Sequence, residues 1–262
     1  MATPTTPATR RLDTTELEAR VKAMYEEVAL TPEREFHFET GRRLAEHLGY
    51  PAPDLDAIPA EAIDSFAGVG YFLDLAAITP GEAVLDLGSG SGTDSLLAAV
   101  ATGPGGAVVG VDMTAAQLAK ATRLAESAGL AHASFLEAYI EHPPVVPGSI
   151  DVVISNGVVN LSPDKPAVFA SAAAALRPGG RLALADIVTA TRLPDGVTCD
   201  ASLWAACIGG AAQRDDYLAL IGAAGFAVET VRENDYRFVS ERAAGATATY
   251  GVRSISLLAR RR

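Results

Sequence analysis

The sequence contains little cysteine, few aromatic residues and a shortage of basic side chains. Two cysteines occur among 262 residues, and a chain of this length can bury a core that needs no disulfide staples. Lys and Arg number 21 against 32 Asp and Glu, which gives a formal net charge of −11. Contacts with phosphates require a basic face, and the only dense basic cluster is the arginine run at 260–262. We therefore expect no nucleic-acid partner.

Long hydrophobic runs are also missing. No apolar stretch reaches the length of a membrane span, about 18 residues, and the first residues lack the basic-then-apolar pattern of a secretion signal. We therefore expect a cytoplasmic protein with no membrane partner. Residues 1–12 are rich in Thr, Pro and Ala, which predicts a disordered tail.

The most informative segment is a glycine turn that follows a short apolar stretch. Residues 83–87 (AVLDL) run into Gly88, Gly90 and Gly92, a pattern that predicts a buried strand, a turn and the start of a helix. Without a Cβ, these glycines can adopt positive φ angles and let a ligand lie against the backbone. Asp112 follows about twenty residues later at the end of the next apolar run, where its carboxylate can accept both hydroxyls of a ribose. The pattern predicts a nucleotide-like cofactor.

The glycine spacing and a preceding acid distinguish between two cofactor classes. G-x-G-x-x-G is typical of a dinucleotide site, whereas the glycines here alternate in G-S-G-S-G. Asp86 stands two residues before the first glycine, and a carboxylate there would repel a pyrophosphate and favour a cationic group. This favours S-adenosylmethionine, whose ammonium and sulfonium are positive, over NAD. An NAD-dependent oxidoreductase and a glycine turn without a ligand are the alternatives.

Strand-like and helix-like segments alternate through the rest of the chain. This alternation predicts a Rossmann-like, doubly wound α/β fold whose mainly parallel sheet is covered by helices on both faces. Two late strand-like segments predict an antiparallel pair, which gives a seven-stranded sheet with an antiparallel final strand. The predicted strands are 83–87, 107–112, 133–137, 150–155, 181–187, 226–234 and 252–261, and the predicted helices are 93–101, 115–128, 164–176 and 214–224.

Residues 13–77 are predicted to form an N-terminal helical lid beside a cofactor-binding domain at 78–262. Apolar residues at 17, 21, 24 and 28 have helical spacing, and Asp13 can cap that helix. A second helix is expected to end at Gly49, and prolines at 51, 53 and 59 mark a linker.

Residues at the predicted strand tips are the candidates for the site, because ligands of open parallel sheets bind beyond the carboxyl ends of the strands. Met113 can pack against an adenine face or belong to the core, and Glu141 can meet the adenine amino edge or cap a helix. Asn156 offers a neutral hydrogen bond at the fourth strand tip. The cofactor-binding candidates are Asp86, Gly88, Ser89, Gly90, Gly92, Asp112, Met113, Gln117, Ile140, Glu141 and Asn156.

Few residues indicate how an acceptor would be bound or deprotonated. Aromatic residues bracket the expected acceptor pocket, and they can equally form the seam between lid and core; they are Phe66, Tyr71, Phe72 and Trp204. A soft lone pair can displace an activated methyl without a base, whereas an oxygen or carbon acceptor needs one. The candidate bases are His37, Glu39, Tyr71 and Asp186.

Six segments occur in a fixed order along the chain, namely VLDLGSGSGTD, VVGVDMT, AYIE, SNGVVNLSPDK, LRPGGRLALADI and LWAACIGGA. In this order they resemble the arsenite methyltransferase branch of the class I S-adenosylmethionine-dependent methyltransferases. The resemblance covers residues 60–230 and implies transfer of a methyl group from S-adenosylmethionine to a small-molecule acceptor. C-methyltransferases of the ubiquinone-biosynthesis type resemble the same core, but they typically have an acid where Tyr139 stands.

The chain departs from the arsenite methyltransferases at two positions that concern the acceptor. The family has an arsenic-binding cysteine where Gly157 stands, and commonly another cysteine where Val69 stands. Cys207 matches a family thiol, which makes it the candidate residue of the acceptor pocket. Cys199 can be a second thiol if the chain between them folds back; alternatively, both cysteines are buried and reduced.

Four functions are therefore compatible with the sequence. The resemblance implies a trivalent arsenic or related thiophilic acceptor, and the missing cysteines favour an organic metabolite methylated on carbon, oxygen or sulfur. The other two are the NAD-dependent oxidoreductase and a protein that binds S-adenosylmethionine without catalysis. No resident metal site is predicted.

Overall fold

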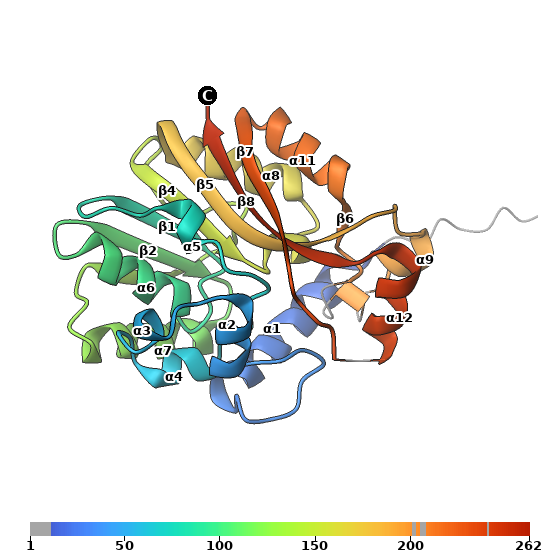
Figure 1. The fold of residues 1–262 in the computed structure, drawn as a ribbon, viewed down its shortest axis with the longest axis horizontal. Coiled ribbons are helices and arrows are strands. Elements are labelled where there is room, and N and C mark those ends of the chain that lie inside the picture. The colour runs from blue at the N-terminus through green and yellow to red at the C-terminus, as the bar shows by residue number, and fades with distance from the viewer. Residues whose placement is uncertain (1–11, 201–202, 205–207, 240) are drawn as a thin grey trace, which may run out of the picture.

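The structure is a computed structural model that describes residues 12–200, 203–204, 208–239 and 241–262 (Figure 1). Its centre is a sheet with the strand order β3-β2-β1-β4-β5-β8-β7, and β6 pairs with β5 beside this path. The strands are β1 (Ala83–Leu87), β2 (Ala107–Asp112), β3 (Ala133–Glu137), β4 (Ile150–Asn156), β5 (Leu176–Thr189), β6 (Ala212–Gln213), β7 (Phe226–Asn234) and β8 (Arg253–Arg261).

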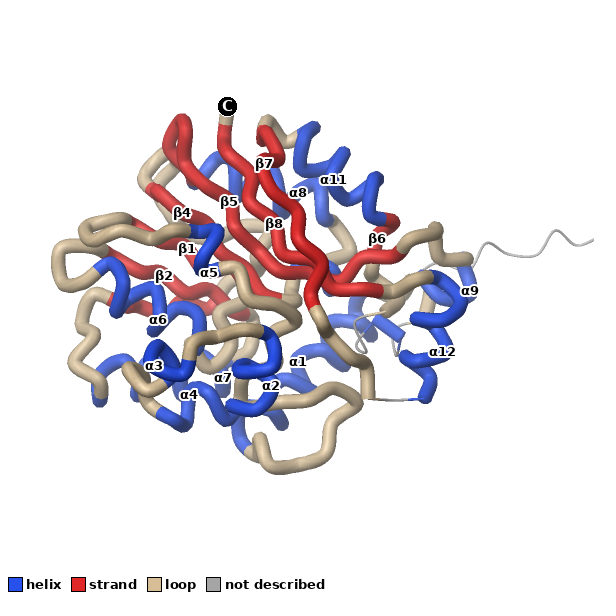
Figure 2. The backbone as a smooth tube through the Cα atoms, viewed as in Figure 1, coloured by secondary structure: helices blue, strands red, loops and turns tan. Residues whose placement is uncertain are grey.

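Helices flank this sheet on both sides (Figure 2). Those of the N-terminal segment are α1 (Thr14–Leu30), α2 (Arg42–Leu48), α3 (Ala52–Leu55), α4 (Ala60–Asp64) and α5 (Leu73–Ala76). Those that follow are α6 (Thr93–Thr102), α7 (Ala115–Ser127), the 3-10 turn η1 (Val159–Leu161), α8 (Lys165–Ala175), α9 (Asp195–Thr198), α11 (Arg214–Ala223) and α12 (Glu241–Tyr250). Among the described residues, no helix combines the length and apolar character needed to cross a membrane.

The predicted doubly wound sheet is confirmed. β1, β2, β3, β4 and β5 pair in parallel, and β8 lies antiparallel between β5 and β7. The expected seven strands form the main path, but the sheet has eight, because two residues of β6 pair with Val188 and Thr189 at the end of β5. A strand of two residues is too short to produce a recognisable pattern of apolar residues, so the sequence could not predict β6.

The start of β5 also differs from the prediction. The predicted strand started at 181, whereas β5 begins at Leu176, which already pairs with Ile150. The register shifts between Ile150 and Val152, so the Pro-Gly-Gly stretch is accommodated as an irregularity within the strand. Helix α12 was not predicted either.

The two faces of the sheet pack into separate clusters, because successive strand residues point to opposite sides. Val152 and Ile154 lie in one cluster with Ala98 of α6. Val153 lies in the other with Phe169 of α8. Both faces are therefore buried, which explains why β4 is apolar at consecutive positions rather than alternating.

The N-terminal segment packs on the same side as α6 and α7. The Asp13 carboxylate caps α1 by accepting the N–H groups of Thr15 and Glu16, each at 3.0 Å. Helix α2 ends at Gly49, whose φ of 103° is left-handed. The predicted helix start and stop are thus confirmed.

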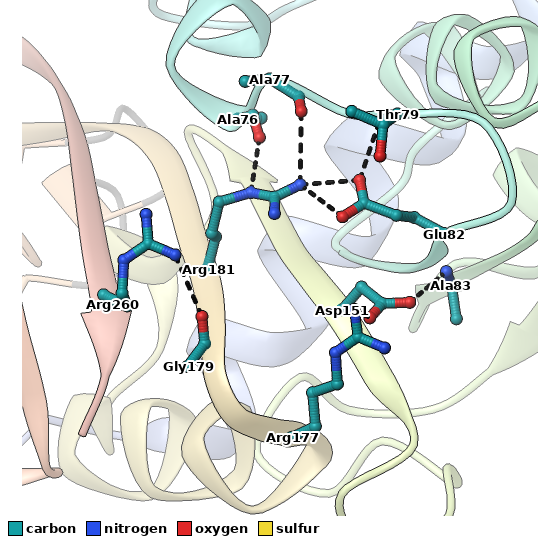
Figure 3. A network of polar contacts seen from close by, with 10 residues as sticks. All are labelled: Ala76, Ala77, Thr79, Glu82, Ala83, Asp151, Arg177, Gly179, Arg181 and Arg260. Carbon is teal, nitrogen blue, oxygen red and sulfur yellow. Dashed lines mark hydrogen bonds and ion pairs between the residues drawn. The ribbon is translucent and has the colours of Figure 1, made fainter.

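A polar network ties the amino ends of the central strands together (Figure 3). Arg181 of β5 donates to both carboxylate oxygens of Glu82 at 2.7 and 2.8 Å, and also to the Ala76 carbonyl at 2.8 Å. The Asp151 carboxylate of β4 accepts the Ala83 N–H at 2.8 Å and forms an ion pair with Arg177. These contacts hold the sheet at the end opposite the glycine turn.

Candidate active site

A cavity of about 510 Å³ lies at the carboxyl ends of the parallel strands. Its volume lies in the range of sites for ligands of nucleoside size. It is lined by the glycine turn 88–91, the strand-tip segments 112–114 and 138–142, the segment 161–164, and Leu17, Val21 and Tyr25 of α1. Helix α1 therefore forms one wall of the cavity.

The glycine turn needs its glycines for two reasons. Gly88, Gly90 and Gly92 have φ angles of 78°, 53° and 94°, which side-chain-bearing residues rarely adopt. A Cβ on Gly88 would also lie only 2.4 Å from Val158 Cγ2. The turn is held by the Val111 carbonyl, which accepts the N–H groups of Gly88 and Ser89 at 2.8 and 3.0 Å.

Asp112 lies at the tip of β2, as predicted, and contacts the glycine turn directly. Its carboxylate accepts the Gly90 N–H at 3.0 Å and the Thr114 N–H at 2.8 Å. Burial raises the pKa of the carboxyl group, and these hydrogen bonds oppose the rise. The sequence analysis missed Gly110 of β2, where a Cβ would come within 2.8 Å of Ser89 Cβ.

Two buried carboxylates lie in the same cavity. Asp86 accepts a hydrogen bond from Ser95 Oγ at 2.6 Å, and its burial, together with the charge of Asp94, raises its pKa to about 8. Burial raises the pKa of Asp94 to about 6. Hydrogen bonds from Tyr50 Oη at 2.6 Å and Asn156 Nδ2 at 3.0 Å have the opposite effect and limit this rise. The described lining residues include neither Lys nor Arg. The cavity is therefore electronegative and can be neutralised by a cationic ligand.

Asn156 lines the cavity, but its side chain is already engaged with the N-terminal segment. Its Oδ1 accepts the Val69 N–H at 2.8 Å, and its Nδ2 donates to Tyr50 Oη at 3.0 Å and to the Gly70 carbonyl at 3.1 Å. Together with Asp94, these residues join β4, α6 and the N-terminal segment. Sequence reasoning missed Tyr50 and Asp94, although Asp94 belongs to the GSGTD motif.

All the remaining cofactor candidates except Gly92 also line the cavity. Gln117 of α7 accepts from Ser91 Oγ and donates to the Tyr25 carbonyl of α1 at 2.8 Å, which links the glycine turn to α1. Glu141 accepts a hydrogen bond from Ser162 Oγ. The full set of predicted cofactor residues that line the cavity is Asp86, Gly88, Ser89, Gly90, Asp112, Met113, Gln117, Ile140, Glu141 and Asn156; Gly92 instead caps α6.

Val69 and Gly157, the two positions where the family resemblance implies cysteines, are direct neighbours. A Cβ on Gly157 would lie 3.1 Å from Val69 Cγ1, so the apolar Val69 side chain packs against this glycine. Cys207 lies outside the described residues, and Cys199 is half-buried. Among the residues that the structure describes, no group of three His, Cys, Asp or Glu side chains could hold a metal ion.

The predicted base candidates lie away from this cavity. His37 and Glu39 line a separate hollow with Phe36, and Asp186 is buried in a hydrogen bond with Tyr217 Oη at 2.6 Å. Of the aromatic residues, Phe66 lines the cavity, whereas the lining residues do not include Tyr71, Phe72 or Trp204. Phe72 is buried in the hydrophobic core, where the N-terminal segment packs on the sheet, and not in the wall of the cavity.

Residues 78–225 match the family of the methyltransferase domain. The arsenite methyltransferase of Halobacterium salinarum is 42% identical over 205 residues, which are 78% of this chain and 52% of that protein. The nocamycin O-methyltransferase of Saccharothrix syringae is 39% identical over 43% of this chain and 40% of its own length. The chain thus spans about half the length of the curated arsenite methyltransferase.

One solved structure is similar in both sequence and fold. The arsenic(III) S-adenosylmethionine methyltransferase from Chlamydomonas reinhardtii superposes with a TM-score of 0.66 at 31% identity, over 80% of this chain and 73% of that one.

Proposed function

The chain belongs to the methyltransferase domain family, and we propose that it transfers the methyl group of S-adenosylmethionine to a small-molecule acceptor. The observation that carries this proposal is the cavity beside the glycine turn, whose acids Asp86, Asp94 and Asp112 face no cationic side chain among the described lining residues. A ligand with an ammonium and a sulfonium would neutralise this site, whereas the pyrophosphate of NAD would be repelled.

The residues of the cavity fit the parts of this cofactor. Asp112 would accept the ribose hydroxyls, Asp86 would face the ammonium group, and the backbone of the glycine turn would pack against the ligand. S-adenosylmethionine supplies a methyl group already activated on a sulfonium. The protein then needs to hold the acceptor in line with this methyl and to exclude water.

For the acceptor, we propose a trivalent arsenic compound first. The support is the 42% identity to an arsenite methyltransferase and the structural likeness to an arsenic(III) methyltransferase. An arsenic lone pair requires no general base, which is compatible with the location of His37, Glu39 and Asp186 away from the cavity lining.

A specific observation favours a second candidate, an organic acceptor. Val69 and Gly157 pack against each other and bring no thiol, so the described residues lack the cluster of soft ligands that trivalent arsenic prefers. The relative that is a nocamycin O-methyltransferase supports this candidate. The formal charge of −11 supports a small molecule rather than a nucleic acid in either case.

We propose further that α1 is a lid over the cofactor cavity. Tyr139 on the opposite wall donates to the Glu18 carboxylate at 2.7 Å, and Lys22 donates to Tyr139 Oη at 3.3 Å. Lys120 of α7 holds the other end of α1 by donating to the Ala29 carbonyl at 3.1 Å. The exposed contacts at Tyr139 can break without disturbing the buried end, which would open the cavity from one side.

Two experiments test the cofactor and the acceptor separately. Calorimetry with S-adenosylhomocysteine and with NAD should show binding of the first alone, and binding of NAD alone would overturn the proposal. Methylation of arsenite in the presence of glutathione should be lost in Cys207→Ser but retained in the matched variant Cys199→Ser. Cofactor binding without any arsenic product would select the organic acceptor, and full turnover by Cys207→Ser would remove that thiol from the mechanism.

A further inference from the structure

Lys165 is a buried lysine that the proposed chemistry does not use. It is the first residue of α8, directly after the N-cap Asp164, and only 8% of its surface is exposed. Lysines are rarely buried, because an ammonium group loses its hydration unless other groups replace the water. The contacts of this side chain must therefore compensate for its burial.

The ammonium of Lys165 is surrounded by carbonyl oxygens and an indole ring. Its Nζ donates to the Ser162 carbonyl at 2.9 Å and to the Asn160 carbonyl at 3.1 Å. The same atom lies 4.9 Å from the ring centroid of Trp204, within the range of a cation–π contact. Lys165 thus joins the segment that follows β4 to a tryptophan that follows β5.

The indole of Trp204 is fixed on further sides. Its Nε1 donates to the Thr198 carbonyl at 2.7 Å. A Cβ on Gly209 would lie 2.4 Å from Trp204 Cδ1, and one on Gly210 would lie 2.5 Å from Trp204 Cε3. Only glycines can approach the ring this closely, so the ring has little freedom to move independently of Lys165.

One of the carbonyls that bind Lys165, that of Ser162, belongs to a residue in the wall of the cofactor cavity, and the other, that of Asn160, directly precedes this wall in the chain. Residues 161–164 line that cavity, and Ser162 Oγ donates to Glu141, which lines it as well. Displacement of this wall by a ligand would therefore move the oxygen atoms that hold the ammonium.

We propose that Lys165 is a positioning residue, which fixes the 161–164 wall of the cofactor cavity to Trp204 and couples ligand binding in the cavity to the indole. The coupling rests on the proposed function, because it requires the cofactor to bind in this cavity. The contact between Lys165 and Trp204 itself does not depend on that function.

The chain contains one tryptophan, so tryptophan fluorescence comes from Trp204 alone and responds to the groups around its indole, Lys165 among them. Burial lowers the pKa of Lys165 to about 8, and the charges of Asp186 and Glu141 oppose that effect. In the ligand-free protein, Trp204 emission should change with pH around a midpoint of about 8, as the ammonium beside the ring loses its proton. The emission of Lys165→Met should show no such transition.

Lys165→Arg is the variant that keeps the charge. Arginine stays protonated through this pH range, so its emission should also show no transition, whereas the response of Trp204 to S-adenosylhomocysteine should remain. Lys165→Met should lose this response while calorimetry still detects binding. Cys199→Ser and Cys207→Ser should keep the wild-type transition, which excludes a thiol as its source.

Three results would overturn the proposal. They are a transition that persists in Lys165→Arg, a transition that disappears in Cys207→Ser, and a response to S-adenosylhomocysteine that is as large in folded Lys165→Met as in wild type. If Lys165→Met does not fold, the pH titration of Lys165→Arg still decides whether the ammonium lies against the indole. Failure of S-adenosylhomocysteine to bind wild type would refute the proposed cofactor and the coupling, but not the titration of the ligand-free protein.

Discussion

Binding of S-adenosylmethionine should release a proton from Asp86. In the ligand-free protein, burial and the neighbouring Asp94 raise the pKa of Asp86 from 3.8 to about 8, so at pH 7 about nine-tenths of this group is protonated. A cation in the cavity favours the carboxylate and brings the pKa down. The affinity for the cofactor should therefore increase between pH 6 and pH 8, by at most about tenfold per pH unit.

The same shift sets the pH dependence of stability. A raised pKa means that the folded protein binds this proton more tightly than the unfolded chain does. The contribution of Asp86 to the free energy of unfolding of the ligand-free protein should therefore fall as pH rises from 3.8 to about 8. A shift of this size corresponds to an upper limit of ~6 kcal/mol, which structural relaxation and water penetration reduce.

The assay is calorimetry of S-adenosylmethionine binding at pH 7 in two buffers with different heats of ionisation. Wild type should release about one proton, whereas Asp86→Asn should release few, because the amide cannot ionise. Asp215→Asn, an exposed change on α11, is the matched control and should behave as wild type. Equal proton release by wild type and Asp86→Asn, or an affinity that falls as pH rises, would refute the reasoning.

Three further predictions follow from single contacts. Asp112→Ala should weaken binding of S-adenosylhomocysteine by about 1–3 kcal/mol in calorimetry, and unchanged affinity would place the ribose elsewhere. Gly88→Ala should abolish binding, since the added Cβ would lie 2.4 Å from Val158 Cγ2 at a φ of 78°; Val158→Ala in the same chain should not restore it, because the Cβ of residue 158 would still lie 2.8 Å away and the backbone strain would remain. Glu82→Gln should lower the melting temperature at pH 7 without changing cofactor affinity. Burial alone would raise the pKa of Glu82, but the hydrogen bond from Arg181 outweighs it and lowers the pKa, so the stabilisation by this pair is present above the ordinary pKa of 4.5 and is lost as pH falls through the lowered value. A melting temperature that does not respond to the substitution would show that the pair contributes nothing.

The strands could be predicted because their signal is local. Residues 83–87, 107–112 and 133–137 were predicted with the bounds that the structure has, since a short strand between two glycine or loop signals differs from its flanks over only a few residues. The glycine turn could be predicted for a similar reason. Positive φ angles such as the 94° of Gly92 favour glycine, so a turn that needs them is visible as glycines in the sequence. The two-residue β6 carries no comparable pattern.

The polar groups of the site could be predicted only in part. Asp86 and Asp112 adjoin the glycine turn in sequence or follow at a known spacing, so they were found. The base candidates His37 and Glu39 were chosen by residue type alone, and the structure places both in a different hollow. Residue type does not show which cavity a side chain enters.

Local patterns in the sequence were sufficient for the bounds of the strands at 83–87, 107–112 and 133–137, for the glycine turn and for a negatively charged site that suits a cationic cofactor. These properties follow from apolar periodicity, from glycine and from acids close to one another in the chain. The hydrogen-bond partners of these acids depend on the tertiary structure, because they come from segments that are distant in the sequence. Tyr50 meets Asp94 across 44 residues of sequence, and Asn156 reaches the same carboxylate across 62. The contact between Val69 and Gly157 likewise arises only when the N-terminal segment packs at the end of β4, because no local pattern encodes contacts between distant segments.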